Sequence, residues 1–429
     1  MPGRVDVVVV GAGAAGLLAA RELQCAGARV RVLEARARVG GRILTRRPVG
    51  TDLPIELGAE FLHGDAPLTR ALLDEYGLSH VAGTGAAWRA SGGRVARAPD
   101  HFRRVGRVLA RIDTGRADES FAAFIARTGK AGAAAASRRD AIRFIEGFHA
   151  ADAERISAHS VAQGVSETAA MRRSARVIAG YDALTGALAA ALDDPVWLSA
   201  PVRGIGWRRG RCDVTVQRGR RAERLRARAA IVTVPVGVLA TPGGLPIDPE
   251  PAGLVRARRQ LVMGDVVRIG FVFRERFWET LGPAGGAELA FLHTPDSEFN
   301  VWWTQYPVAA PVLVAWAGGT SAARVRRLDP AAQAALALDG LARATGRNRR
   351  SLQRQLADWH TYDWGADPFS AGAYSYARVG GAGAGRALGR AVEGTVWFAG
   401  EATAEASGTV EGALVSGRRA ARAVLRALA

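Results

Sequence analysis

The sequence contains little cysteine, almost no lysine and no long hydrophobic run. Only two of its 429 residues are cysteine, Cys25 and Cys212, and two cysteines cannot build a disulfide framework or a zinc site. The apolar stretch from Gly11 to Ala20 is interrupted by glycine and is too short to span a bilayer. The first expected strand begins at Asp6, with no secretory signal before it. We therefore expect a cytoplasmic protein without a membrane partner.

Lysine is nearly absent although the formal charge is +18. Arginine supplies all but one of the 58 basic side chains, because Lys130 is the single lysine. Between residues 102 and 111, Phe102, Val105 and Leu109 recur at helical spacing with arginines between them. This pattern is typical of an amphipathic helix with a solvated basic face. Nucleic-acid binding would need the positive charge gathered on one surface, so we expect no nucleic-acid partner.

The N-terminal region alternates strand, turn, helix and strand. A four-valine strand over Asp6–Val10 leads into a glycine-rich turn at 11–16 and a helix over Leu17–Cys25. A second strand follows over Arg29–Leu33 and ends at Glu34. The continuous apolar run of the first strand is typical of a parallel sheet that is buried on both faces. The pattern predicts a βαβ unit and an α/β fold.

The rest of the chain divides into helical and strand-like regions. Residues 68–179 are expected to be mainly helical, with one hairpin turn at 91–93. Strand-like segments are expected at 196–235, 266–273, 299–316 and 396–399. A helix from Thr409 to the C-terminus repeats the strand-then-helix order of the start. Nucleotide-binding signals at both ends predict a discontinuous Rossmann-type domain interleaved with a second domain.

The turn after the first strand matches the pattern G-x-G-x-x-G. Gly11 allows the tight turn, Gly13 lets a pyrophosphate approach the backbone, and Gly16 lets the helix pack on the strand. The helix N-terminus offers amides and a positive dipole end to phosphates. Glu34 stands where it can accept hydrogen bonds from a ribose.

The Gly-Gly-Arg at 40–42 predicts that the bound dinucleotide is FAD and not NAD. It brings the Arg42 guanidinium beside a diphosphate, whose oxygens the planar fork of arginine binds in pairs. The alternative interpretation, a basic surface turn, suits Arg36 or Arg38 in so arginine-rich a chain.

At this point the sequence resembles the flavin-containing amine oxidase family, which includes monoamine oxidases, polyamine oxidases and lysine-specific histone demethylases. The segments that carry the resemblance are 57–64, 232–239, 397–401 and 408–413. The resemblance implies FAD, a glutathione-reductase-like FAD domain, and a substrate domain with a mixed sheet and a helical part.

The resemblance also implies domain limits and cofactor contacts. The FAD domain would comprise 1–67, 190–245 and 390–429, and the substrate domain 68–189 and 246–389, with its helical part at 100–180. Together with the glycine loop, it predicts the cofactor-binding residues Gly11, Gly13, Ala14, Ala15, Gly16, Glu34, Ala35, Gly41, Arg42, Leu57, Gly58, Ala59, Glu60, Val202, Glu401, Thr409 and Val410.

Tyr374 falls at one wall of the aromatic cage of the family, where an aromatic face guides the amine and excludes water. A tyrosine packed in the core is the alternative interpretation. Monoamine oxidases attach the flavin through a cysteine just before this tyrosine, and Ala373 stands there, so we expect non-covalent FAD. Thr409 stands at the position of the second wall of the cage. This residue makes the sequence more similar to polyamine oxidases and demethylases than to monoamine oxidases. The expected substrate-binding residues are Glu60, His63, Tyr374 and Thr409.

The family has a lysine that holds a water against the flavin N5, and Arg268 stands at this position. Strand alternation places Arg268 on one face with Val266 and Val272, so we expect the cation to be partly buried and to need a partner. The water, a flavin atom or a substrate carboxylate could serve. The change reflects drift, a slower oxidase, or selection for a carboxylate-bearing amine. We expect Arg268 to keep the water-anchoring role, and Arg268 and Tyr374 are the catalytic candidates. No metal site is expected.

The leading hypothesis is an amine oxidase that transfers hydride from the amine to flavin N5. An imine would leave, and oxygen would reoxidise the flavin to give hydrogen peroxide. A flavin oxidase or desaturase acting on an amino acid or a carbon–carbon bond is the alternative. The positive charge disfavours polyamines, because repulsion slows their encounter with the protein. Neither a chromatin regulator nor an NAD-dependent dehydrogenase fits as well. We expect a monomer or homodimer acting on a small amine.

Overall fold

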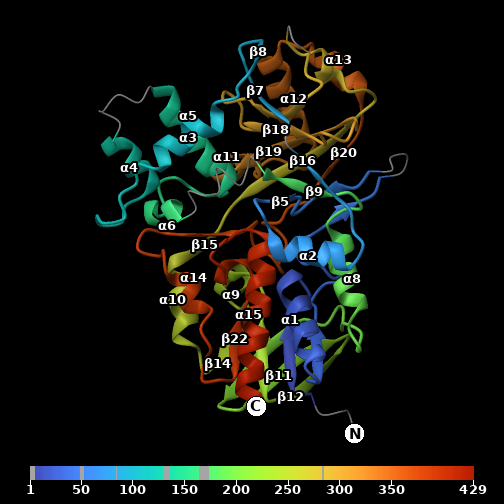
Figure 1. The fold of residues 1–429 in the computed structure, drawn as a ribbon, viewed down its shortest axis with the longest axis vertical. Helices are drawn as coiled ribbons and strands as arrows, with labels where there is room; N and C mark the ends of the chain where they lie inside the picture. Colours follow the sequence, from blue (N-terminus) through green and yellow to red (C-terminus); the bar gives the residue numbers. More distant parts are fainter. Residues whose placement is uncertain (1–4, 49–52, 84, 129–134, 164–172, 283–284) are drawn as a thin grey trace.

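The computed structural model describes residues 5–48, 53–83, 85–128, 135–163, 173–282 and 285–429, and all structural statements concern these (Figure 1). Both chain ends lie at the lower end of the molecule in this view, and the large mixed sheet lies in the upper half. Within the described residues, no helix has the length and apolar character needed to cross a membrane.

A parallel sheet in the lower half joins three distant parts of the sequence. Its strand order is β2-β1-β13-β22, with β1 at Val7–Val10, β2 at Val30–Leu33, β13 at Ala229–Val232 and β22 at Val396–Phe398. All four residues of β1 are buried, as the four-valine run predicted. The α/β class predicted from the sequence is therefore confirmed.

Helices pack on one face of this sheet, and a second sheet packs on the other. Helices α1 (Ala14–Cys25) and α15 (Val410–Leu428) share one core with Val7 and Val9. The opposite face packs Val8 and Val10 against a second sheet. That sheet has the order β12-β11-β10-β14, with β10 at Val202–Arg208, β11 at Arg211–Arg218, β12 at Arg221–Ala227 and β14 at Ile247–Asp248.

The upper half contains a seven-stranded mixed sheet of order β20-β16-β19-β18-β17-β7-β8. Its strands are β7 (Ala86–Ser91), β8 (Arg94–Arg97), β16 (Val266–Phe273), β17 (Leu289–His293), β18 (Val301–Thr304), β19 (Val312–Gly318) and β20 (Leu356–Thr361). Helix α12 (Pro330–Thr345) covers one face and shares a core with Phe271 and Trp302. The other face, with Trp303 and Val314, forms a separate cluster with Leu57.

A group of helices beside this sheet forms its own core. They are α3 (His101–Leu109), α4 (Phe121–Thr128), α5 (Ala135–Phe148) and α6 (Ala158–Gln163). In α3, Val105 and Leu109 are buried while Arg103 and Arg107 are exposed. The amphipathic helix predicted from the arginine spacing is therefore confirmed.

The remaining elements connect these layers. The short strands are β3 (Thr45–Arg46), β4 (Ile55–Glu56), β5 (Phe61–Leu62), β6 (His80–Ala82), β9 (Ala175–Val177), β15 (Leu261–Met263) and β21 (Ser375–Ala377). The helices are α2 (Pro67–Glu75), α8 (Asp182–Ala190), α9 (Val236–Ala240), α10 (Ala252–Gln260), α11 (Gly319–Val325), α13 (Arg349–Gln355) and α14 (Ala384–Leu388), with 3₁₀ turns η2 (Phe277–Thr280) and η3 (Glu401–Thr403).

The region from 68 to 179 is less helical than the sequence suggested. It contains β6, β7, β8 and β9, and β9 pairs with both β5 and β6. These strands are short, and β9 finds its partners about a hundred residues earlier, so local periodicity carries little signal of the pairing. The hairpin at 91–93 is confirmed, since Gly92 and Gly93 adopt φ of 57° and 80° between β7 and β8.

Candidate active site

A cavity of about 960 Å³ extends from the β1–α1 turn into the upper half of the molecule. That volume is large for a small-molecule site and suits a ligand of cofactor size. All sequence-derived site candidates except Gly16 line it, namely Gly11, Gly13, Ala14, Ala15, Glu34, Ala35, Gly41, Arg42, Leu57, Gly58, Ala59, Glu60, His63, Val202, Arg268, Tyr374, Glu401, Thr409 and Val410.

The β1–α1 turn needs glycine at two positions. Gly11 has a φ of 106°, in the left-handed region that favours glycine. A Cβ on Gly16 would lie 1.9 Å from the Gly11 carbonyl oxygen, so a side chain there would separate α1 from the turn. No side chain caps α1 at Gly13, and Ala14 and Ala15 line the cavity. The first amides of α1 therefore suit an anionic group.

A second glycine turn lies against the first. The Gly40 amide donates to the Ala12 carbonyl at 2.8 Å, and a Cβ on Gly41 would lie 3.4 Å from the Gly13 Cα. Gly40 and Gly41 have φ of 97° and 59°. The two turns form a narrow backbone cradle that side chains would fill, as close approach of a diphosphate requires.

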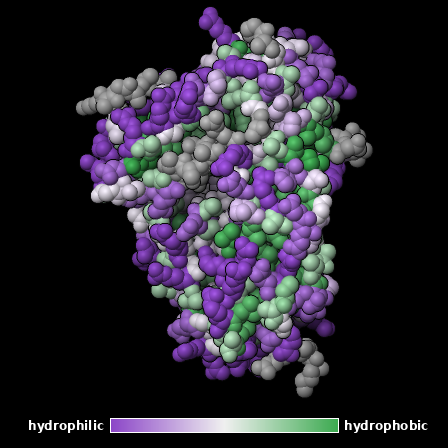
Figure 2. Space-filling model, in the orientation of Figure 1, coloured by the Kyte–Doolittle hydropathy of each residue, from purple (hydrophilic) through white to green (hydrophobic). Residues whose placement is uncertain are grey.

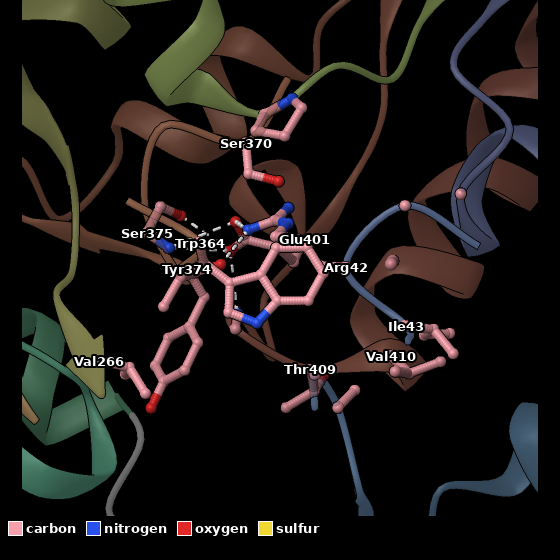
Figure 3. Close-up of a pocket in the computed structure, with 18 of the residues that line it drawn as sticks. Arg42, Ile43, Val266, Trp364, Ser370, Tyr374, Ser375, Glu401, Thr409 and Val410 are labelled. Carbon is pink, nitrogen blue, oxygen red and sulfur yellow. Dashed lines mark hydrogen bonds and ion pairs between the residues drawn. The ribbon is translucent and has the colours of Figure 1, made fainter. Parts of the chain in front are cut away.

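Arg42 and Glu401 form a partly buried ion pair between segments near the two chain ends (Figure 3). Arg42 Nη1 donates to Glu401 Oε1 at 2.9 Å and to the Ala373 carbonyl at 2.7 Å. The other Glu401 oxygen accepts from Ser375 Oγ at 2.8 Å and from the Gly408 amide at 3.1 Å. The guanidinium has five N–H donors, so other donors remain for a ligand in the cavity.

Glu34 is held in place by two amides. Its carboxylate accepts from the Ala12 amide at 2.8 Å and from the Arg36 amide at 2.9 Å. Arg36 does not form a surface turn, because its side chain pairs with Asp367 and donates to Ser370 Oγ, each at 2.8 Å. Carboxylate oxygens accept several hydrogen bonds, so Glu34 can still accept from a ribose.

The N-terminus of α15 opens on the cavity. The Thr409 hydroxyl accepts from the Gly412 amide at 2.9 Å and caps the helix, while Thr409 and Val410 line the cavity. Glu411 accepts from the amides of Leu68 and Thr69, in the first turn of α2. The positive end of α15 and the entry of α2 are therefore fixed relative to each other.

A buried ion cluster surrounds Glu60. Arg268, which is 4 % exposed, donates to Glu60 and to the Gly58 carbonyl. Arg176, from β9, donates to the other Glu60 oxygen at 2.6 Å, and Trp303 Nε1 donates to Glu60 at 2.9 Å. The sequence predicted that Arg268 is partly buried and needs a partner; the side chain is fully buried, and Glu60 was not among the partners considered.

Burial and the neighbouring arginines together set the charge states of two acids, Glu60 and Glu56. Burial by itself raises the pKa of Glu60, yet the guanidinium groups of Arg268 and Arg176 bring it below its ordinary value. Burial raises the pKa of Glu56, in β4, to about 7, although hydrogen bonds from Tyr181 and Thr45 oppose the shift. Glu60 therefore stays charged between two cations, while Glu56 gains and loses its proton near neutral pH.

Tyr374, which Figure 3 draws as sticks, contacts segments that are distant in the sequence. Its hydroxyl donates to the Phe148 carbonyl at 2.7 Å. Its ring lies against Gly408, where a Cβ would approach within 3.1 Å. His63 packs against Phe61 and Phe148, and burial lowers its pKa to about 4. The imidazole is therefore neutral at physiological pH.

Sequence reasoning missed several residues that line the cavity or hold its walls, namely Phe148, Arg176, Trp303, Trp316 and Trp364. Trp302 and Trp303 are adjacent in β18 but point to opposite faces of the sheet, and only Trp303 lines the cavity. Tryptophan content and strand periodicity cannot decide which of the two faces a ligand. Trp364 lies in a loop and donates to the Leu57 carbonyl at 2.7 Å.

A dinucleotide cradle continuous with an aromatic-walled chamber defines a nucleotide-cofactor oxidoreductase. The model of the family described as flavin-containing amine oxidoreductase matches residues 14–425. The chain belongs to this family, and membership implies a flavin cofactor. The expected family is thereby confirmed.

Relatives with similar sequences agree with this assignment, and a solved structure shares the fold. The chain is 29 % identical over 98 % of its length to lysine-specific histone demethylase 1 homolog 2 of Oryza sativa, and spans 57 % of that protein. It is 29 % identical over 97 % of its length to polyamine oxidase 4 of the same species, and spans 88 % of it. Cyclohexylamine oxidase from Brevibacterium oxydans superposes with a TM-score of 0.84 at 22 % identity over 99 % of this chain and all of that chain, which shows the shared fold.

Proposed function

We propose that the protein is an FAD-dependent amine oxidase that binds FAD without a covalent bond. The observation that carries the proposal is the continuity of one cavity from the Gly11–Gly16 turn to Tyr374 and Arg268. Ala373, immediately before Tyr374, has no nucleophilic side chain, which supports non-covalent binding. We propose the division into FAD and substrate domains at the sequence-derived limits, with oxygen as the final electron acceptor.

We assign the cofactor contacts by chemistry. The amides at the start of α1 and the Arg42 guanidinium would hold the diphosphate, because both offer donors to phosphate oxygens. Glu34 would accept from the adenosine ribose, and Glu401 would take part in holding the opposite part of the cofactor. Bound FAD supplies the hydride acceptor, and the protein supplies orientation and electrostatics.

The chain's own residues prepare the amine. Amine oxidation requires a neutral amine, and neutral His63 adds no charge to the chamber. The rings of Tyr374, Trp303 and Phe148 line the cavity and would exclude bulk water. Glu60 is part of the cavity wall. Its ion pairs support a role in fixing the position of Arg268, in addition to any direct contact that Glu60 makes with substrate.

We propose that Arg268 anchors a water through its Nε. Its terminal nitrogens bond to Gly58 and Glu60, whereas Nε is buried and has no hydrogen-bond partner among the described residues. A buried N–H without a partner costs free energy, and a water could satisfy it. Lysine also donates to water, so we expect Arg268→Lys to reduce flavin at an equal or faster rate. Stopped-flow absorbance measures this, and a collapse of the reduction rate would contradict the assignment.

We also propose a cytoplasmic monomer or homodimer. Cys25 and Cys212 are both free, which supports a reducing compartment. Gel filtration and light scattering of the purified protein measure the oligomeric state directly.

The proposed function has a direct test. Purified protein should be yellow, and anaerobic addition of an oxidisable amine should bleach the flavin absorbance. Admission of air should restore the colour with release of hydrogen peroxide. A colourless protein that takes up no FAD when it is supplied would overturn the proposal.

A further inference from the structure

The cavity continues past the aromatic wall into a second, polar region. Residues from α3, α5, β7 and the β17–β18 connection line it, in the upper half of Figure 1. We define the distal subsite as Arg89, His101, Asp140, Arg143, His293 and Asn300, all of which line the cavity. None of these residues was singled out by the sequence.

Two members of the distal subsite are buried without hydrogen-bond partners for part of their polar side chains. His293 is 7 % exposed and its Nε2 has no partner, and Asn300 is 4 % exposed and its Oδ1 has none, among the described residues. The ring of His293 stacks on His101 with centroids 3.8 Å apart. Burial, followed by the influence of His101 and Arg89, holds the pKa of His293 well below its usual value, so the ring is neutral. Buried polar groups are normally satisfied, so these two indicate a polar ligand.

The negative charges that face the cavity are already engaged. Asp140 pairs with Arg89 at 2.9 Å, Glu60 with Arg176 and Arg268, Asp65 with Arg173, and Glu401 with Arg42, while Glu34 and Glu411 accept from backbone amides. Among the described residues that line the cavity, every carboxylate except Glu411 pairs with an arginine, and Glu411 lies at the start of α15, outside the distal subsite. A diamine that reached the distal subsite would therefore bury its second ammonium with no unpaired carboxylate among the subsite residues.

The positive charges are not balanced in the same way. Arg143 donates to Ser321 Oγ at 3.1 Å and has no carboxylate within ion-pair distance among the described residues. Two acids feel the charge of Arg143, namely Glu146, which accepts from Thr320, and Glu298, which pairs with Arg324. An arginine with donors to spare, lining the same cavity as a neutral imidazole and an amide, suits a carboxylate.

We propose that the distal subsite binds a carboxylate on the far end of the substrate, so that the protein oxidises an amino-carboxylate rather than a polyamine. The inference rests on the proposed amine oxidation. Arg143 would bind the carboxylate, and His293 and Asn300 would donate to it, the amide of Asn300 turning its NH₂ toward the ligand. Arg89 and Asp140 would position the subsite without contacting substrate.

The test compares substrates matched in length. Holoenzyme is assayed with an alkylamine, the ω-amino acid and the α,ω-diamine at four, six and eight carbons, and kcat and KM are measured separately. We expect the ω-amino acid to have the highest kcat/KM of its set, by about tenfold, with the difference mainly in KM. A diamine equal to or better than the amino acid at every length would overturn the proposal.

Variants distinguish the specific loss of carboxylate binding from a general loss of folding or activity. Arg143→Gln should abolish the preference, Arg143→Lys should retain it, and Arg139→Gln, exposed one turn earlier on the same helix, should behave as the unmodified protein. If Arg143→Gln does not fold, Asn300→Asp replaces it and should lower kcat/KM for the amino acid alone. An unchanged preference in a folded Arg143→Gln or Asn300→Asp protein contradicts the proposal.

Calorimetry with hexanoate and hexanol keeps the two proposals distinct. Hexanoate should bind at least about tenfold more tightly than hexanol, and Arg143→Gln should remove the difference. If no amine reduces the flavin but hexanoate binds in this way, the amine oxidase assignment fails and the subsite stands. If amines are oxidised but hexanoate binds no better than hexanol, the subsite fails and the assignment stands.

Discussion

Two buried arginines share one carboxylate at the centre of this protein. Arg268 and Arg176 come from strands far apart in the sequence, and Glu60 meets both from the loop between β4 and β5. Removal of one partner from a buried ion cluster leaves uncompensated charge, which costs more than the cluster contributes. Glu60 is therefore a structural requirement whatever its contact with substrate.

Replacement of Glu60 tests this role. We expect Glu60→Gln to lower the free energy of unfolding by about 3–5 kcal/mol, because two guanidinium groups lose their counter-charge. Denaturant unfolding measures the change. The exposed Glu405→Gln is the matched control and should leave stability within about 0.5 kcal/mol of the unmodified protein. A neutral effect of Glu60→Gln would show that the cluster is screened by water.

Glu56 predicts a dependence of stability on pH. Burial raises its pKa to about 7 from an ordinary value of 4.5, so the folded protein keeps a proton that the unfolded chain releases. Stability therefore falls as the pH rises from about 4.5 to about 7 and is flat above that, as far as this group is concerned. In Glu56→Gln this component disappears, and the variant should gain up to about 3 kcal/mol relative to the unmodified protein between pH 4.5 and pH 8.

Urea unfolding at several pH values measures the Glu56 effect. Glu405→Gln again serves as the control and should follow the pH profile of the unmodified protein. A constant difference between Glu56→Gln and the unmodified protein across the range would show that Glu56 ionises normally in the fold.

At the scale of elements, the start of α1 depends on the glycine that lets it touch the turn before it. We expect Gly16→Ala to yield protein with little or no bound FAD, because the added methyl would lie 1.9 Å from the Gly11 oxygen. The ratio of flavin to protein absorbance after purification measures this. Gly186→Ala is the control, since Gly186 is also helical and its added methyl meets nothing within 4 Å. It should retain FAD and gain up to about 1 kcal/mol in stability.

At the scale of the whole molecule, bound FAD should contact residues near both ends of the chain and stabilise the folded state. The expected contacts come from 11–16, 34–42, 57–60 and 400–410, so FAD binds the folded chain and not the unfolded one. At a hundredfold excess over its Kd, FAD should raise the unfolding free energy by about 2.7 kcal/mol. Hydrogen exchange should slow at 11–16 and 400–410 together when FAD is added, and α13 should not respond. A response at only one chain end would contradict a shared site.

The charge of the whole molecule is less concentrated than its total suggests. Hydrophilic residues spread over both halves of the visible face (Figure 2), and arginines on many elements pair with acids. This distribution supports the expectation of no nucleic-acid partner, which stays a prediction.

Much of the fold could be predicted because its signals are local. The β1–α1 turn, the hairpin at 91–93 and the basic face of α3 each depend on neighbouring residues, and each has the predicted form. The pairing of β9 with β5 and β6 was missed, because its partners are distant in sequence. Among site residues, Arg176 in β9 was missed for the same reason, whereas Trp303 was missed because strand periodicity cannot decide whether it or Trp302 faces the cavity.

The sequence by itself determined the family, the α/β class and the two glycine turns at 11–16 and 40–41, because glycine patterns and strand periodicity depend on residues that are close together in the chain. Only the tertiary structure decided which charges meet. Glu60 became the partner of Arg268, and Arg143 has no carboxylate partner among the described residues, because side-chain burial and ion pairing depend on contacts between segments far apart in the sequence.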